Sequence, residues 1–207
     1  MRIAVTGASG FIGEYVLAEL GRRGCDVIAT SRSGQPPAGA PTAARWVELD
    51  LHAPKPGSFE HLGRPDVLVH LAWAGLPNYR SLHHFDSELP AQYAFLSGLV
   101  QQGLPAMVVA GTCFEYGFQS GPLSPSLETR PANPYGFAKD SLRRQLQFLR
   151  AQQPFRLAWA RLFYVYGPGQ ASGSLYPLIR QAVARGDRVF PMSGGEQLRD
   201  YIHVSDV

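Results

Sequence analysis

The sequence predicts an α/β fold built on a doubly wound parallel sheet. Three observations predict it. Short apolar runs alternate with helical patterns, apolar residues make up 45% of the 207 residues, and a glycine-rich turn joins the first apolar run to the first helix. Apolar strands separated by helices are typical of a parallel sheet covered on both faces. Ligands of such sheets bind at the carboxyl ends of the strands, so functional residues are expected there.

Each element follows from its local pattern. Short runs of β-prone apolar residues predict strands at Ile3–Thr6, Asp26–Thr30, Trp46–Leu49, Val67–Ala72, Ala106–Gly111 and Leu157–Leu162. Apolar residues at three- and four-residue steps predict helices near Phe11–Arg23, His84–Gln102, Tyr135–Gln152 and Ser174–Arg185.

Beyond Tyr166 the alternation of strands and helices fades. We therefore expect residues 1–165 to form the sheet-bearing domain and residues 166–207 to begin a separate, incomplete lobe. The chain stops at Val207 within what looks like a strand leading into a helix. We expect its natural counterpart to be longer.

The first turn carries glycines at positions 7, 10 and 13, directly after the strand Ile3–Thr6. Strand, glycine turn and helix aim backbone N–H groups and a helix N-terminus at a pyrophosphate. Gly7 allows the sharp turn, Gly10 the close approach of phosphate, and Gly13 the packing of the helix on the sheet. The spacing is one residue wider than the common dinucleotide fingerprint. The alternative is a strand-turn-helix without a ligand.

A candidate catalytic group combines Thr112, Tyr135 and Lys139. Thr112 directly follows an apolar strand, and Tyr135 and Lys139 lie four residues apart on one predicted helix face. Asn133 suits the N-cap of that helix and Pro134 its first position. The alternative is an incidental tyrosine and lysine on one face, which the accompanying threonine and glycine turn disfavour.

A catalytic Tyr135 would need its pKa lowered by about 2–3 units, which corresponds to about 3–4 kcal/mol. The helix dipole is expected to supply part of this shift and the Lys139 ammonium much of the remainder. Lys55 and Lys139 are the only lysines, against 17 arginines among the 19 basic residues. A compact point charge at position 139 fits this task.

Composition excludes several classes of function. The net charge is +3 and the pI is near 9.0, but the arginines are scattered, so no nucleic-acid surface is predicted. Cys25 and Cys113 fit no metal spacing and predict a reducing, cytoplasmic setting without a metal. No apolar run is long enough to cross a bilayer, so no membrane partner is expected.

Together these motifs resemble the extended short-chain dehydrogenase/reductases, the NAD-dependent epimerase/dehydratase family acting on nucleotide sugars. The likeness runs over almost the whole chain. Thr6–Gly13 is similar to the family's phosphate loop, Thr112 with Tyr116-Gly117 to its catalytic segment, and Arg199–Val204 to a segment that holds substrate phosphates. The resemblance implies a Rossmann-like domain and a small C-terminal lobe for the substrate.

The resemblance also implies the binding residues. Asp50 matches the acid that receives the adenine amino group, and His70-Leu71-Ala72 the strand end beside the ribose. The implied cofactor-binding set is Gly7, Ser9, Gly10, Phe11, Ile12, Gly13, Asp50, Leu51, Leu71, Ala72, Trp73, Tyr135, Lys139 and Phe163. The implied substrate-binding set is Thr112, Cys113, Tyr135, Tyr164 and Arg199.

Within the resemblance, Tyr135 exchanges a proton with the sugar oxygen, Thr112 positions that oxygen, and Lys139 also holds the nicotinamide ribose. Hydride moves between the nicotinamide and the sugar carbon, while the protein supplies orientation and electrostatics.

At two places the sequence departs from the family's pattern, and these departures limit the reactions that can be expected. Sugar dehydratases of the family place an Asp-Glu pair where this chain has Cys113 and Phe114, so dehydration is not expected. Cys113 is alternatively an acid in an epimerisation or a small strand residue. Tyr164 replaces an asparagine that often contacts substrate; it either enters the pocket or packs.

Simple oxidation or reduction at one sugar carbon remains. The runs Gly111–Gly117 and Arg161–Tyr164 look like those of dTDP-6-deoxy-L-talose 4-dehydrogenases, which interconvert a 4-keto-6-deoxy nucleotide sugar and its alcohol. The alternatives are a nucleotide-sugar 4-epimerase and, of another class, a non-catalytic dinucleotide-binding sensor or scaffold.

Cofactor choice is predicted from the end of the second strand. An acid there accepts the ribose hydroxyl of NAD, whereas an arginine accommodates the extra phosphate of NADP. The chain reads Thr30-Ser31-Arg32-Ser33, so Arg32 predicts NADP(H) in preference to NAD(H). The alternative is a solvent-facing arginine. The resemblance further implies a homodimer formed through the two long helices.

Overall fold

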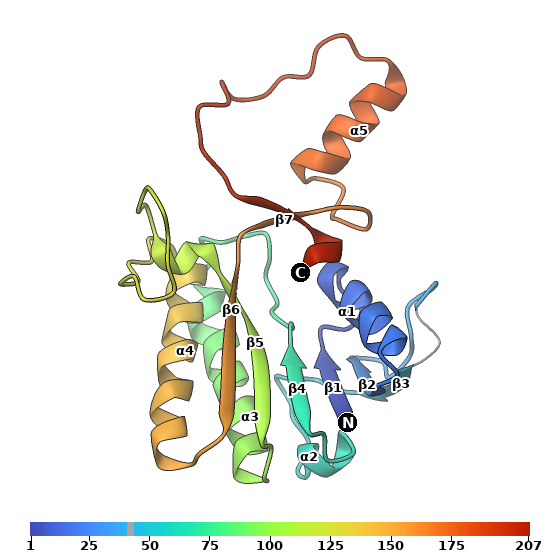
Figure 1. The fold of residues 1–207 in the computed structure, drawn as a ribbon, viewed down its shortest axis with the longest axis vertical. Helices are drawn as coiled ribbons and strands as arrows, with labels where there is room; N and C mark the ends of the chain where they lie inside the picture. Colours follow the sequence, from blue (N-terminus) through green and yellow to red (C-terminus); the bar gives the residue numbers. More distant parts are fainter. Residues whose placement is uncertain (41–43) are drawn as a thin grey trace. The chain divides into compact units, whose positions relative to one another are not determined.

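The central sheet consists, in the described residues, of six parallel strands in the order β3-β2-β1-β4-β5-β6 (Figure 1). The structure is a computed structural model that describes residues 1–40 and 44–207. The strands are β1 (Arg2–Thr6), β2 (Asp26–Ser31), β3 (Ala44–Glu48), β4 (Val67–His70), β5 (Ala106–Thr112) and β6 (Arg156–Leu162).

Helices cover both faces of this sheet. Ala4 of β1 faces a cluster with α3 (Leu89–Gln101) and α4 (Pro134–Gln152), while its neighbours Ile3 and Val5 face a cluster with α1 (Phe11–Arg22). Successive strand residues point to opposite faces, so the wholly apolar run of β1 is what a doubly covered strand requires. The predicted Rossmann-like α/β fold is therefore confirmed.

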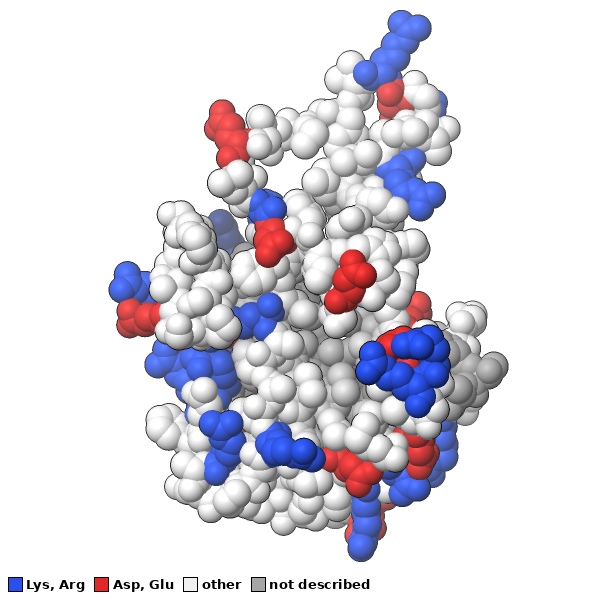
Figure 2. Space-filling model, in the orientation of Figure 1, with Lys and Arg blue, Asp and Glu red and all other residues white. Residues whose placement is uncertain are grey.

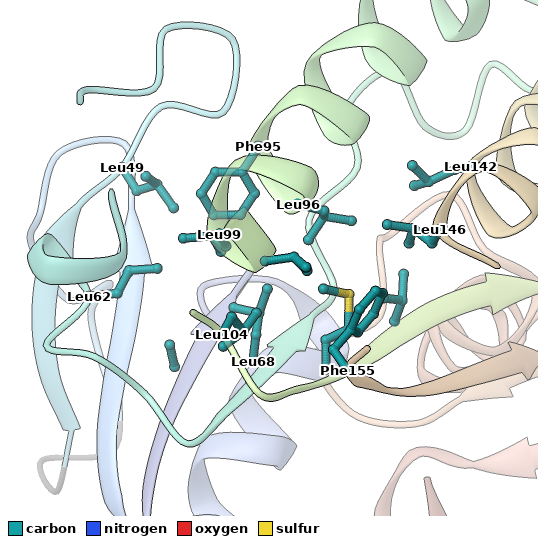
Figure 3. Close-up of a cluster of buried hydrophobic side chains, with 14 of the residues drawn as sticks. Leu49, Leu62, Leu68, Phe95, Leu96, Leu99, Leu104, Leu142, Leu146 and Phe155 are labelled. Carbon is teal, nitrogen blue, oxygen red and sulfur yellow. The ribbon is translucent and has the colours of Figure 1, made fainter. Parts of the chain in front are cut away.

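The larger core lies between the sheet and the pair α3–α4 (Figure 3). Its labelled side chains are almost fully buried and come from α3, α4, the strands and their connections: Leu49, Leu62, Leu68, Phe95, Leu96, Leu99, Leu104, Leu142, Leu146 and Phe155. This core fixes α4 against β5, which places the start of α4 beside the end of β5.

Most of the predicted elements are found, and several details differ. The predicted helix at 84–102 begins as a π-helical segment, η1 (His84–Glu88), and becomes α-helical only at α3. The strand predicted to reach Ala72 ends at His70, and beyond it the Ala72 carbonyl accepts a hydrogen bond from the Gln92 side chain. A short helix, α2 (Ser58–His61), and a 3₁₀ turn, η2 (Cys113–Tyr116), were not predicted.

The chain divides into two compact units, Met1–Leu162 and Phe163–Val207. The second unit contains β7 (Tyr164–Tyr166), α5 (Leu175–Arg185), β8 (Tyr201–His203) and the 3₁₀ turn η3 (Val204–Asp206). Its two strands pair in parallel.

Charged side chains are interspersed over the face drawn in Figure 2, with Lys and Arg among Asp and Glu. Among residues 1–40 and 44–207, no helix combines the length and apolar character that a membrane span requires. Within the same residues, no group of His, Cys, Asp and Glu side chains is arranged to hold a metal ion.

Candidate active site

Close contacts within the protein require glycine at two of the three glycine positions in the turn after β1. Gly7 has a φ of +68°, and a Cβ there would lie 2.7 Å from the Ala72 nitrogen. A Cβ on Gly13 would lie 2.3 Å from the Gly7 carbonyl oxygen. Gly7 therefore permits both the left-handed turn and the close passage of the segment after β4, and Gly13 permits α1 to pack on the turn.

Gly10 is different, because the protein itself does not require a glycine there. Its backbone is extended (φ −91°, ψ 170°), and an added Cβ would meet only the Gly7 oxygen, at 3.3 Å. Gly10 is exposed and caps α1 without a side-chain hydrogen bond. Among the described residues, no side chain therefore accepts from the first N–H groups of α1, which suits an anionic group such as a pyrophosphate.

The other predicted dinucleotide contacts lie at the same edge of the sheet. Ser9 is exposed in the turn, and Phe11 and Ile12 are half-buried in the first turn of α1. Arg32 is exposed directly after β2. Asp50 follows β3, is exposed, and accepts a hydrogen bond from the His52 main chain at 2.9 Å.

A further predicted contact, Leu51, is half-buried and packs against the larger core. Leu71, Ala72 and Trp73 follow β4 and are also half-buried. Ala72 lies closest to the glycine turn, as the space around Gly7 shows.

A buried polar network holds this segment after β4. The His70 Nε2 donates to Gln92 Oε1 (2.6 Å), and the Thr6 hydroxyl donates to His70 Nδ1 (2.8 Å). This pattern needs a neutral imidazole. Burial, and then the nearby Lys139 charge, lower the pKa of His70 to about 3. His70 therefore joins the ends of β1 and β4 as a neutral group, a structural role.

Glu88 completes the network from η1. Its fully buried carboxylate accepts from the Ala74 main chain (3.0 Å), from Gln92 (3.0 Å) and from the half-exposed His52 (2.6 Å). Gln92 also donates to the Ala72 carbonyl (3.3 Å). Side chains of η1 and α3 thus hold the main chain on both sides of Trp73.

The candidate catalytic residues meet where β5 ends and α4 begins. Thr112 is the last residue of β5, and Tyr135 lies in the first turn of α4. The Asn133 side chain caps α4 by accepting from the Gly136 N–H at 2.8 Å, as predicted. A Cβ on Gly136 would lie 2.5 Å from the Phe114 carbonyl oxygen. The glycine after Tyr135 therefore allows α4 to approach the turn that carries Thr112.

Thr112, Tyr135 and Lys139 converge in the structure. The side chains of Thr112 and Tyr135 are hydrogen-bonded to each other. The Lys139 Nζ donates to the Ala110 carbonyl at 2.8 Å and lies 4.2 Å from the centroid of the Trp73 ring. The three residues are 6%, 8% and 2% exposed, respectively. They form one group, and Trp73 links it to the segment beside the glycine turn.

Aromatic rings surround Tyr135. Ring centroids within about 6 Å belong to Trp73 (5.9 Å), Tyr79 (5.6 Å), His84 (5.3 Å) and Phe114 (6.1 Å). The His84 ring accepts from the Trp73 indole N–H at 3.1 Å and donates to the Asn78 carbonyl at 2.9 Å. His84 therefore orients Trp73, a role not predicted from the sequence.

The electrostatics correct one prediction. The pKa of Tyr135 was predicted to fall, but burial raises it above its ordinary value, and the hydrogen bond with Thr112 offsets this only in part. The charges of Tyr79, Glu115 and Cys113 raise it further. The pKa of Lys139 is lowered to about 7, chiefly by burial. Within the polypeptide itself, the helix dipole and Lys139 therefore do not outweigh the effect of burial on the Tyr135 pKa.

The remaining predicted residues are placed as follows. Cys113 is half-buried in η2, next to Thr112. Phe163, Tyr164 and Arg199 belong to the second unit. There the Arg199 guanidinium lies 4.4 Å from the centroid of the Tyr164 ring and donates to its hydroxyl. Tyr164 thus contacts the predicted phosphate-binding arginine within that unit.

Sequence reasoning missed three buried polar side chains that shape the site: Glu88, Gln92 and Glu115. For Glu115 a signal existed, because Thr112-x-x-Glu115 is the spacing of a capping box, and the structure contains that box. Glu88 and Gln92 lie four residues apart, but no local sequence pattern predicts that these two polar side chains are buried.

The arrangement suits proton transfer beside a dinucleotide. A phenol and a hydroxyl share a hydrogen bond, and a buried ammonium lies one helical turn away. A glycine turn with an uncapped helix follows β1, two strands from β5 at the same edge of the sheet. Such a set can bind a carbonyl or hydroxyl oxygen, move a proton to or from it, and hold a pyrophosphate nearby.

Comparisons with known proteins agree with this geometry. The family model described as "NAD dependent epimerase/dehydratase family" matches residues 3–207. A dTDP-6-deoxy-L-talose 4-dehydrogenase (NAD(+)) of Aggregatibacter actinomycetemcomitans is 32% identical over 100% of this chain and 77% of its own length. A UDP-glucose 4-epimerase of Azospirillum brasilense is 28% identical, over 100% of this chain and 66% of its own.

A similar solved structure is MoeE5 in complex with UDP-glucuronic acid and NAD. It superposes with a TM-score of 0.83 and 32% identity, over 100% of this chain and 69% of MoeE5.

Proposed function

Because this chain belongs to the NAD-dependent epimerase/dehydratase family, we propose that it is an oxidoreductase that interconverts a 4-keto-6-deoxy nucleotide sugar and its alcohol. The observation that carries the proposal is the convergence of Thr112, Tyr135 and Lys139 beside the strand end that borders the glycine turn. The similarity to a 4-dehydrogenase supports the sugar class.

In this proposal the protein handles the proton and the geometry. During reduction Tyr135 donates its phenolic proton to the carbonyl oxygen of the sugar and becomes a phenolate, and during oxidation the phenolate takes the proton of the hydroxyl. Thr112 hydrogen-bonds the same oxygen and orients it. A nicotinamide cofactor, when bound, supplies or accepts the hydride at the sugar carbon. The aromatic rings around Tyr135 exclude water from the proton donor.

The chain's residues fit such a cofactor at several places. The N–H groups of the glycine turn and of the start of α1 would hold the pyrophosphate, with Gly10 giving the close approach. Asp50 and Leu51 would hold the adenine side. The segment Leu71–Trp73 would lie along the ribose, with Lys139 on the nicotinamide ribose hydroxyls.

Turnover of candidate sugars tests the proposal. We expect the purified chain to consume reduced nicotinamide cofactor with a dTDP-4-keto-6-deoxy sugar, followed as a loss of nicotinamide absorbance. No turnover of any 4-keto nucleotide sugar in either direction would overturn the proposed reaction.

A 4-epimerase is the second candidate, favoured by the similarity to a UDP-glucose 4-epimerase. It would isomerise a nucleotide sugar with no net change in nicotinamide absorbance. Product analysis after incubation with UDP-glucose alone separates the two reactions.

For the cofactor, the family is NAD-dependent, and we propose a preference for NADP(H) within it. The support is Arg32, exposed directly after β2 where no carboxylate stands among residues 30–33. The names of the relatives above print NAD, so the test is direct. We expect tighter binding of NADPH than of NADH, and loss of that difference in Arg32→Ala. Tighter binding of NADH by the unmodified chain would refute the preference.

We propose that residues 166–207 begin the substrate-binding lobe. Arg199 would hold the phosphates of the sugar nucleotide, with Tyr164 against its guanidinium. Cys113 would border the sugar, and Phe163 the cofactor. Arg199→Ala is expected to raise the KM for the sugar nucleotide and leave the Kd of the cofactor unchanged.

We also propose a homodimer formed through α3 and α4. Two aromatic side chains of α4 are exposed, Phe137 (52%) and Phe148 (75%), and Phe137 contacts Phe85 of η1. Such exposed aromatic side chains are typical of interfaces. We expect light scattering to give the mass of a dimer, and we expect Phe148→Glu to lower that mass.

We also propose a cytoplasmic location, because the chain has only two cysteines. Cell fractionation tests this location.

A further inference from the structure

Glu115 is a buried carboxylate that the proposed reaction does not use directly. It lies in η2, one turn after Thr112, and is fully buried. Its Oε1 accepts from the Thr112 main-chain N–H at 2.8 Å and from the Trp159 indole N–H at 2.9 Å. Its Oε2 accepts from the Arg161 Nε at 2.7 Å. One carboxylate therefore ties the end of β5 to β6.

The sequence makes room for this arrangement at Gly111. A Cβ at that position would lie 2.2 Å from the Trp159 Nε1 and 2.6 Å from the Glu115 Oε1. Trp159 and Arg161 are two residues apart on β6, so their side chains leave the same face of the sheet. In the pairing of β5 with β6, Gly111 lies opposite Arg161. The glycine, the indole and the guanidinium thus together accommodate the carboxylate.

Two guanidinium groups balance the charge of Glu115. Arg161 forms the ion pair at 2.7 Å, and Arg143 of α4 lies 3.8 Å from the same oxygen. Both arginine side chains are largely buried. Arg161 in addition donates to the Tyr116 hydroxyl at 3.0 Å. Charge-assisted hydrogen bonds of this kind keep the carboxylate in one orientation.

Lys139 lacks such a direct partner. In the part of the chain that the structure describes, no carboxylate forms an ion pair with its ammonium, which contacts the Ala110 carbonyl and the Trp73 ring. The titratable groups around it are Glu88 from η1, Glu115 from η2, His70 from β4, and Tyr135 one turn earlier on α4. Of these, Glu115 and Glu88 raise the pKa of Lys139 against the effect of burial.

We propose that Glu115 is a positioning residue for the reaction: anchored by Trp159 and Arg161, it fixes the main chain of Thr112, two residues after the Ala110 carbonyl that holds the Lys139 ammonium. The inference rests on the proposed function, because it assigns Glu115 to the same site. Thr112 is held at its own main-chain N–H, and the Lys139 ammonium is held at the Ala110 carbonyl, two residues earlier on the same strand.

The effect of Glu115 on Lys139 can be measured without turnover. The chain has two lysines, so isotope-labelled lysine gives two side-chain NMR titrations, with Lys55 exposed as an internal reference. We expect Glu115→Gln to lower the titration midpoint of Lys139 by about one pH unit or more and to leave that of Lys55 unchanged. The matched control is Glu128→Gln, the same change at an exposed glutamate, which should move neither midpoint.

The positioning part is measured by kinetics. Misplacement of a reacting group by about 1 Å can cost about 100-fold in rate, so Glu115→Gln is expected to lower kcat by at least about tenfold. The KM for the cofactor should stay unchanged, and the loss should be smaller at lower pH, where Lys139 is protonated again. Trp159→Phe keeps the carboxylate and Arg161 and removes one donor. It is expected to lower kcat severalfold and leave the Lys139 midpoint unchanged.

These results separate the two hypotheses. A folded Glu115→Gln variant with the original Lys139 midpoint and original kcat overturns the inference. If that variant does not fold, a folded Trp159→Phe variant with unchanged kcat overturns it instead. If the unmodified chain turns over no nucleotide sugar, the proposed function fails, whereas the lysine titration still decides whether Glu115 affects the protonation of Lys139.

Discussion

The ammonium of Lys139 lies over the Trp73 ring, 4.2 Å from its centroid, and the indole N–H of Trp73 is in turn held by His84 at 3.1 Å. A cation over an indole face is stabilised by the ring quadrupole, and more so where water is excluded. The contact therefore offsets part of the cost of burying the charge, and it joins α4 to the segment beside the glycine turn.

Replacing this lysine should change how stability depends on pH. The pKa of Lys139 is about 7 in the fold, against about 10.4 in an unfolded chain. Between these values the unfolded state holds more protons, so stability rises with pH by up to about 1.4 kcal/mol per unit. Lys139→Met should remove this rise and abolish turnover. Urea unfolding of both proteins across that window measures it, and parallel stability curves would show that Lys139 does not titrate there.

Tyr135→Phe removes the proton donor and keeps the ring among its aromatic neighbours. We expect kcat to fall by about 10²–10⁴, the usual contribution of general acid–base catalysis, with the thermal unfolding midpoint little changed. Tyr93→Phe is the matched control, because Tyr93 lies on α3, packs against the larger core and should keep full activity. Unchanged turnover of every candidate sugar by Tyr135→Phe would refute the catalytic assignment and favour a sensor or scaffold.

The two glycines of the turn should separate stability from binding. Gly13→Ala puts a Cβ 2.3 Å from the Gly7 oxygen, so we expect a loss of about 1–3 kcal/mol or more in the free energy of unfolding. Gly10→Ala meets only a 3.3 Å contact and should cost no more than about 0.5 kcal/mol. It should nevertheless weaken cofactor binding by about tenfold or more, measured by calorimetry. Equal cofactor affinity in Gly10→Ala would argue against pyrophosphate at this turn.

Acid stability should depend on His70. Its pKa is about 3 in the fold and about 6.5 when unfolded, so below pH 6.5 the unfolded state gains a proton that the fold excludes. Stability therefore falls, as the pH drops from about 6.5 to about 3, by up to about 1.4 kcal/mol per unit. His70→Gln should show a shallower fall over this window than the unmodified chain. Identical slopes would mean that the imidazole is protonated in the fold.

The features that depend on a short local pattern could be predicted from the sequence. The apolar run of β1, the glycine turn and the Asn133-Pro134 start of α4 are local patterns, and the structure confirms the strand, the turn and the cap. The convergence of Thr112 with Tyr135 was predictable as well, because Thr112 ends β5 and the helix that follows, α4, begins at the same edge of the sheet.

Other features depend on contacts between distant residues. The rise of the Tyr135 pKa follows from burial among the rings of Trp73, Tyr79 and Phe114, which come from the connection after β4 and from η2. No local period reports such burial. The early end of β4 likewise depends on Gln92, whose side-chain amide donates a hydrogen bond to the Ala72 carbonyl of the departing main chain.

The π-helical segment His84–Glu88 determines the direction in which the His84 side chain points relative to α3. A π turn accommodates an additional residue in a helix, and each residue corresponds to about 100° of rotation around the axis. Shortening this segment by one residue would therefore swing His84 away from Trp73 while α3 kept its place in the core. The π-helical segment thus connects α3, which packs in the core, to His84, which orients the indole that contacts the Lys139 ammonium.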